Sequence, residues 1–116
     1  MGIGFSRYIN QFYIKKYMNF EEIEKELNIK ILFLNPKNFK IGKTGKSLEE
    51  RYDEEYKDSY KEIEEIYCNS SKIKIDELEK HLIRNFIDNP RCDNEQIGSG
   101  EMKDTGAYSV YLVFNK

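Results

Sequence analysis

The sequence is poor in cysteine, histidine, proline and tryptophan, and these scarcities narrow the class of protein. The chain has two cysteines, Cys68 and Cys92, which lie far apart in the sequence, and one histidine. No zinc-binding spacing is present. We expect both thiols to be reduced, as in a cytoplasmic protein. No signal peptide is recognisable, and no apolar run approaches the length of a membrane span. We therefore expect a cytoplasmic protein without a membrane segment.

The composition is that of a small folded domain. The chain is 39% hydrophobic and 34% charged, with two prolines in 116 residues, which is typical of a folded protein rather than a disordered one. This length fits one domain, residues 1–116, with a modest core. Nine tyrosines and seven phenylalanines can fill that core and its rim, although tyrosine is also common on binding surfaces.

The charge is unevenly distributed. The net charge of −2 argues against non-specific coating of nucleic acid. Residues 37–51 carry five basic and two acidic side chains, whereas residues 53–65 carry seven acidic and two basic ones. The first segment is suited to hold an anion, and the second would repel one. The alternative is two solvated faces, which charge runs usually form.

The segment KIGKTGKSLEERY, residues 40–52, combines glycines and basic residues as a phosphate-binding loop does. A Walker A loop also needs a glycine five residues before the glycine of its GK pair, because consecutive backbone amides wrap the phosphate. Lys37 and Lys40 occupy the two possible positions. A triphosphatase of the Walker type is therefore disfavoured.

Helical periodicity dominates the beginning of the chain. Residues 5–17 place apolar side chains on one stripe, which predicts a helix. A second short helix is expected to begin at Asn19, because Glu22 stands where the acid of a capping box belongs. Ile23 and Leu27 would form its buried side.

Strands and further helices are predicted after this point. Residues 29–34 and 39–44 read as the two strands of a hairpin, and a helix follows from Ser47. The remaining elements are a strand over 60–67, for which a helix is the alternative, the clearest helix over 72–87, a polar loop over 93–106 and a last strand over 108–114.

These elements predict an α+β fold, with a small antiparallel sheet flanked by helices, because the hairpin makes the first pairing antiparallel. The long helix would pack its apolar stripe on the sheet. The expected contacts are Leu78, Leu82, Ile83 and Phe86 on the helix and Ile31, Phe33 and Ile41 on the strands.

Two stretches, FKIGKTGKSLEERY at 39–52 and LEKHLIRNFIDNPRCDN at 78–94, together resemble the GIY-YIG nuclease superfamily. In that family a strand hairpin ends in a tyrosine-isoleucine-glycine-like triplet, and a short helix carrying an arginine follows. A later helix carries a glutamate, with a proline and an asparagine after it. The matching residues are Lys40-Ile41-Gly42, Arg51, Glu79, Pro90 and Asn94. The resemblance covers residues 29–94 and leaves two N-terminal helices and one C-terminal strand as additions.

The resemblance implies a DNA endonuclease that binds one divalent metal, expected to be Mg²⁺, through Glu79. Arg51 would stabilise charge that develops on the phosphate, and Asn94 would be a third catalytic residue that positions the others. The phosphate-binding residues would be Lys40, Gly42, Lys43 and Lys46.

The chain departs from the family at both tyrosines of the name motif. The first triplet, glycine-isoleucine-tyrosine, is replaced by part of KILFL, so its tyrosine becomes Leu32 or Phe33. Neither residue has a hydroxyl group to handle a proton. The second tyrosine becomes Lys40. Tyr52 or Tyr56, from the arginine helix, are the alternative hydroxyls.

We therefore expect a degenerate GIY-YIG-like module that binds a phosphate-bearing ligand, either a nucleic acid or a nucleotide. Size and fold analogy alone suggest a phage-type counter-defence factor. The first alternative is an active, magnesium-dependent DNA endonuclease. The second is a homo-oligomeric interaction domain, in which the last strand pairs edge to edge with a second copy.

Overall fold

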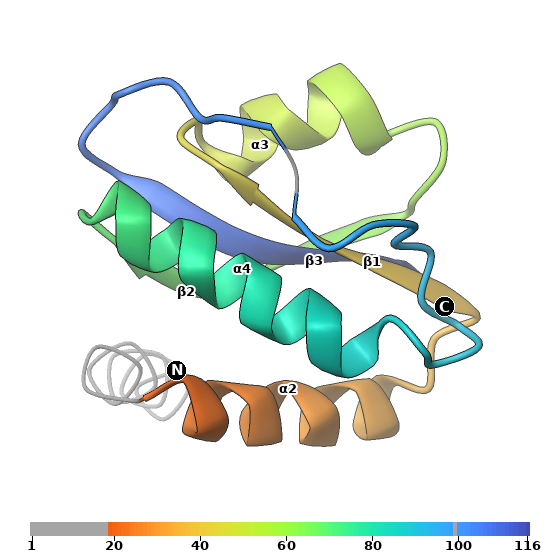
Figure 1. Cartoon of the computed structure of the whole chain (residues 1–116). Coiled ribbons are helices and arrows are strands. Elements are labelled where there is room, and N and C mark those ends of the chain that lie inside the picture. The colour runs from red at the N-terminus through yellow and green to blue at the C-terminus, as the bar shows by residue number, and fades with distance from the viewer. Residues whose placement is uncertain (1–18, 99) are drawn as a thin grey trace, which may run out of the picture.

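The computed structural model describes residues 19–98 and 100–116. This part of the chain forms three α-helices, a short π-helical turn and a three-stranded sheet (Figure 1). In chain order the elements are α2 (Phe20–Leu34), β1 (Asn38–Thr44), α3 (Leu48–Arg51), η1 (Tyr52–Tyr56), β2 (Glu62–Asn69), α4 (Lys72–Phe86) and β3 (Tyr108–Asn115). The helix predicted over residues 5–17 lies outside the described residues.

Helix α2 begins as the sequence predicts. The Asn19 side chain accepts a hydrogen bond from the Glu22 backbone at 2.9 Å, and the Glu22 carboxylate accepts one from the Asn19 backbone at 3.4 Å. This capping box satisfies two backbone donors of the first turn. Ile23 and Leu27 are buried, as expected.

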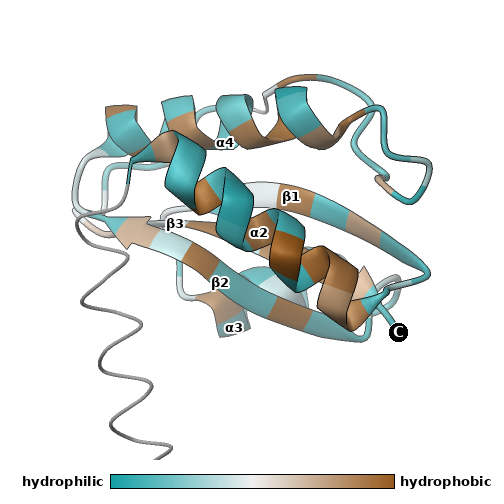
Figure 2. Cartoon of the chain, turned by 90° about the horizontal axis from the view of Figure 1, so that it is seen from below, coloured by the Kyte–Doolittle hydropathy of each residue, from teal (hydrophilic) through white to brown (hydrophobic). Residues whose placement is uncertain are grey.

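The strand predicted over residues 29–34 is wrong, because α2 continues through these residues to Leu34. Ile31 extends the buried stripe by one further turn, so a helix keeps it in the core, and the left-handed backbone of Asn35 ends the helix. Leu32 and Phe33 are instead 71% and 87% exposed, and Figure 2 shows hydrophobic residues on this end of α2.

The sheet has the strand order β1-β3-β2, and both pairings are antiparallel. Strand β1 was expected to return from a hairpin with residues 29–34, but its partner is the last strand of the chain. Strand β3 suits a central position because it is apolar on both faces. Val110, Leu112 and Val113 are each 0% exposed. Since β3 is paired on both sides, it has no free edge, and the alternative in which this strand pairs edge to edge with a second copy is wrong for β3.

Helices cover both faces of the sheet. Helices α2 and α4 lie on one face, and α3 with η1 lies on the other (Figures 1 and 2). The larger apolar cluster contains Ile31 and Ile41 together with the α4 residues Leu78, Leu82, Ile83 and Phe86. These predicted core residues are confirmed, whereas Phe33 is not part of the core.

The architecture is a compact α+β domain, as the sequence predicts. The capping of α3 by Ser47, which accepts from the Glu50 backbone at 3.2 Å, is also confirmed. Strand β2 and helix α4 form where they were expected. Within the described residues, no helix is long and apolar enough to cross a membrane.

Candidate functional site

A cleft of about 450 Å³ lies beside the edge strand β1. Its walls come from β1, helix α4, the α3–η1 segment and the loop after α4. The cleft brings together six of the residues that the sequence marked: Lys40, Gly42, Lys43, Arg51, Glu79 and Asn94. Marked residues from four separate segments thus line one cleft.

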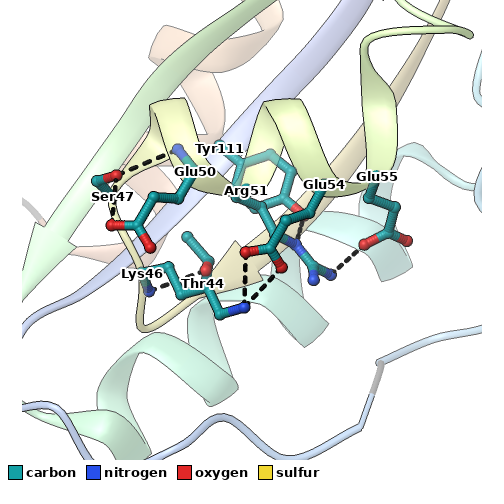
Figure 3. A network of polar contacts seen from close by, with 8 residues as sticks. All are labelled: Thr44, Lys46, Ser47, Glu50, Arg51, Glu54, Glu55 and Tyr111. Carbon is teal, nitrogen blue, oxygen red and sulfur yellow. Dashed lines mark hydrogen bonds and ion pairs between the residues drawn. The ribbon is translucent and has the colours of Figure 1, made fainter.

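Lys46 was also predicted to bind phosphate, but it does not line the cleft. Its ammonium group contacts both carboxylate oxygens of Glu54, at 2.6 and 2.8 Å (Figure 3). Lys46 also borders a separate cavity of about 710 Å³, next to Ser47 and Leu48. Lys46 is therefore placed with α3–η1 and not with the lysines of the cleft.

Arg51 is held by two side chains in the cleft. Its Nε atom donates to the Tyr111 hydroxyl at 3.2 Å, and its Nη2 atom lies 2.7 Å from Glu55 (Figure 3). Burial lowers the pKa of Arg51, but the hydrogen bond to Tyr111 and the charge of Glu55 raise it by more. The guanidinium therefore stays charged, and its orientation is fixed.

The π-helical turn places a tyrosine beside this arginine. The Lys57 backbone donates to the Tyr52 carbonyl at 3.0 Å, which is an i to i+5 hydrogen bond. The wider turn brings Arg51 and Tyr56, five positions apart, onto the same side, with the guanidinium carbon 5.8 Å from the ring centroid. The Tyr56 hydroxyl lies 2.7 Å from that of Tyr111.

Tyr111 is a site residue that the sequence motifs do not indicate. It stands directly opposite Gly42 in the β1–β3 pairing, and a Cβ atom at Gly42 would lie 2.4 Å from Tyr111 Cζ. Gly42 therefore leaves room for the tyrosine ring to cross β1. A glycine inside a predicted strand was the available signal, because it indicates a close approach at that point.

The cleft thus contains hydroxyl groups, and one of them, Tyr56, is among the predicted alternatives. Leu32 and Phe33 are exposed on α2. Tyr52 donates its hydroxyl to the Tyr60 carbonyl at 2.5 Å, and only Tyr56 of the two alternatives lines the cleft. Burial, followed by the nearby Tyr56, raises the pKa of Tyr111, so the Tyr111 hydroxyl acts as a hydrogen-bonding group rather than as an ionised base.

Glu79 is buried with Lys43. Its side chain is 1% exposed, and Lys43 Nζ lies 3.6 Å from Glu79 Oε1 and also contacts Asp76. A buried carboxylate needs such a compensating charge. The ammonium of Lys43 already provides it. A carboxylate that is buried and paired in this way does not fit a resident Mg²⁺ ion, which needs an accessible oxygen ligand and keeps several waters.

Asn94 lines the cleft but is bound to the sheet edge. Its amide accepts from the Ile41 backbone and donates to the Ile41 carbonyl, both at 2.9 Å. These are the hydrogen bonds that a further strand would make, so Asn94 satisfies the edge of β1. Its observed contacts are structural.

Tyr60 and Asp93 form a further hydrogen-bonded pair in the cleft. Tyr60 donates its hydroxyl to Asp93 at 2.6 Å, and both residues line the cleft. Burial and then this hydrogen bond raise the pKa of Tyr60, which therefore stays protonated. Neither residue was marked by sequence reasoning, because they belong to no motif and lie far apart in the chain.

Comparison with known proteins gives no further guidance. No protein-family model, no curated protein and no solved structure matches this chain.

Proposed function

We propose that the protein binds a phosphate-bearing ligand in the cleft beside β1. The observation that carries this proposal is the convergence of Lys40 and Arg51 on one cleft, from two separate segments of the chain. Lys43 lies in the same cleft but already compensates Glu79. Contacts with Tyr111 and Glu55 use only part of the Arg51 guanidinium, which has five N–H donors. Its remaining donors suit the oxygens of a phosphate group.

The strand pairing supports a GIY-YIG type of site with a permuted chain order. In that family a strand hairpin carries both name triplets. Here the strand paired with Lys40-Ile41-Gly42 is β3, which carries Ser109-Val110-Tyr111, and Tyr111 stands opposite Gly42. We therefore assign the position of the first family tyrosine to Tyr111. The strand that carries it follows the glutamate helix in the chain and does not precede the glycine triplet.

The proposal is tested by the thermal stabilisation that a ligand gives, because a compound that binds only the folded state raises the melting temperature. Adenosine monophosphate is a suitable probe. Lys40→Ala and Lys46→Ala remove the same charge from the same lysine-rich segment, but only Lys40 lines the cleft. We expect the melting-temperature shift to shrink in Lys40→Ala and to persist in Lys46→Ala. Equal shifts in both variants would remove the cleft as the binding site.

DNA cleavage is the second candidate function. It is favoured by the Tyr111 and Tyr56 hydroxyls beside Arg51, since hydrolysis of a phosphodiester needs a group that orients water next to a cation. A plasmid-nicking assay with and without Mg²⁺ or Mn²⁺ tests it on the wild type and on Tyr111→Phe. Nicking by the wild type that is lost in Tyr111→Phe would support cleavage. An intact plasmid under every condition would leave binding as the function.

A further inference from the structure

The basic and acidic side chains of the cleft differ in their exposure to solvent. Among the described residues, three basic and four acidic side chains line it: Lys40, Lys43 and Arg51, and Glu55, Glu79, Asp93 and Glu95. The side chain of Lys43 is 3% exposed and that of Arg51 is 30% exposed. Three of the acids, in contrast, are exposed at the surface, and only Glu79 is buried. The side chains of Lys43 and Arg51 are thus less exposed than Glu55, Asp93 and Glu95, and we call these three exposed carboxylates the mouth of the cleft.

The wall next to the mouth is also acidic. Exposed acidic side chains cover α3 and η1: Glu49, Glu50, Asp53, Glu54 and Glu55. A hydrogen bond from Lys46 lowers the pKa of Glu54, so this carboxylate is ionised at neutral pH and also engages Lys46, which does not line the cleft. A phosphate that passes along this wall would therefore meet negative charge.

This layout separates two classes of phosphate ligand. Duplex DNA carries closely spaced phosphates, and its affinity comes from several lysine and arginine contacts at once. Only the phosphate inside the cleft would find cations, while its neighbours would lie within a Debye length, about 8 Å at physiological salt, of the carboxylates at the mouth. A single terminal phosphate on an uncharged body avoids this repulsion.

We propose that the cleft selects a small phosphate monoester of mononucleotide size over a polynucleotide. This inference rests on the proposed phosphate-binding function. The volume of about 450 Å³ lies in the range of small-molecule sites. Tyr56 and Tyr60 also line the cleft, but both are buried, so its size and its charges rather than aromatic stacking would set the selection.

Calorimetry on the wild type tests the selection with four probes: adenosine monophosphate, ribose 5-phosphate, adenosine and a short DNA duplex. We expect both monophosphates to bind at least about tenfold more tightly than the duplex and adenosine. The duplex would be repelled by the carboxylates at the mouth, and adenosine has no phosphate group. Equal affinities of the two monophosphates would identify the phosphate and sugar as the recognised part. A tighter adenosine monophosphate complex would add the base.

A charge variant at the mouth tests the cause of the selection. Glu95→Gln removes one exposed carboxylate from the cleft, whereas Glu77→Gln makes the same change on an exposed position of α4 that does not line it. We expect Glu95→Gln to strengthen duplex binding several-fold and to change monophosphate binding little, with no effect of Glu77→Gln. A wild type that prefers the duplex, with a steep salt dependence, would overturn this inference and leave the proposed function standing. Failure of every phosphate probe to bind would overturn both.

Discussion

The ring of Tyr111 lies so close to Gly42 that a Cβ atom there would be 2.4 Å from the tyrosine Cζ and Oη atoms. This contact joins the first and the last strand of the sheet, and it brings the Tyr111 hydroxyl to Arg51 and Tyr56. The glycine of the KIG triplet is therefore explained by a partner at the other end of the chain.

Gly42→Ala is expected to destabilise the fold by roughly 1–3 kcal/mol, because the buried ring cannot move away without repacking. Urea denaturation measures the change. Gly100→Ala is the matched control, since a Cβ atom at Gly100 has no neighbour within 4 Å. A loss of stability that is the same for both variants would show that the Tyr111 contact is not the cause.

Glu79→Gln is expected to cost roughly 1–3 kcal/mol, because it leaves Lys43 buried with less compensating charge. Glu77→Gln, on the exposed side of α4, should be close to neutral. The same melting experiments with added Mg²⁺ should show no specific stabilisation of the wild type, since the ammonium already neutralises Glu79. A magnesium-dependent rise in melting temperature that disappears in Glu79→Gln would restore Glu79 as a metal ligand.

Asn94→Asp keeps the size of the side chain but removes the N–H donor that binds the Ile41 carbonyl. An edge-strand acceptor then loses its partner and faces a carboxylate, so we expect a cost of roughly 1–3 kcal/mol. Asn28→Asp, at an exposed position of α2, provides the control. Equal unfolding free energies for the two variants would mean that Asn94 does not support the sheet edge.

Leu82→Ala and Leu32→Ala make the same deletion in two helices with opposite burial. Leu82 is 0% exposed in the core, and Leu32 is 71% exposed. We expect Leu82→Ala to cost roughly 2–5 kcal/mol and Leu32→Ala less than about 0.5 kcal/mol in chemical denaturation. The reverse order would contradict the helical assignment of residues 29–34.

Local features of the fold were predictable from the sequence, whereas the strand pairing was not. The capping box at Asn19 and the apolar stripe of α4 each lie within a few consecutive turns, so their signals are local. Residues 29–34 are apolar except for Lys30, and so short a run has no clear period that would distinguish a helix from a strand. Only the packing of Ile31 on the core decides between them.

The candidate site shows the same division. Arg51, Glu79 and Asn94 could be marked because they belong to short motifs, and they do line one cleft. Tyr111, Tyr60 and Asp93 reach the cleft through long-range contacts that no local pattern encodes. The partner of β1 comes last in the chain, so the contact of Tyr111 with Gly42 could not be predicted from the residues around β1.

The affinity for adenosine monophosphate, measured by calorimetry on the wild type, Arg51→Ala and Arg84→Ala, tests the phosphate-binding claim most directly. Arg51 lies inside the cleft, and Arg84 is an exposed arginine of α4 that does not line it. A hydrogen bond to a charged group contributes about 1.5–3 kcal/mol, so Arg51→Ala should weaken binding by about tenfold or more. Arg84→Ala should bind as the wild type does. An affinity of Arg51→Ala equal to that of the wild type would show that the cleft beside β1 does not bind the phosphate.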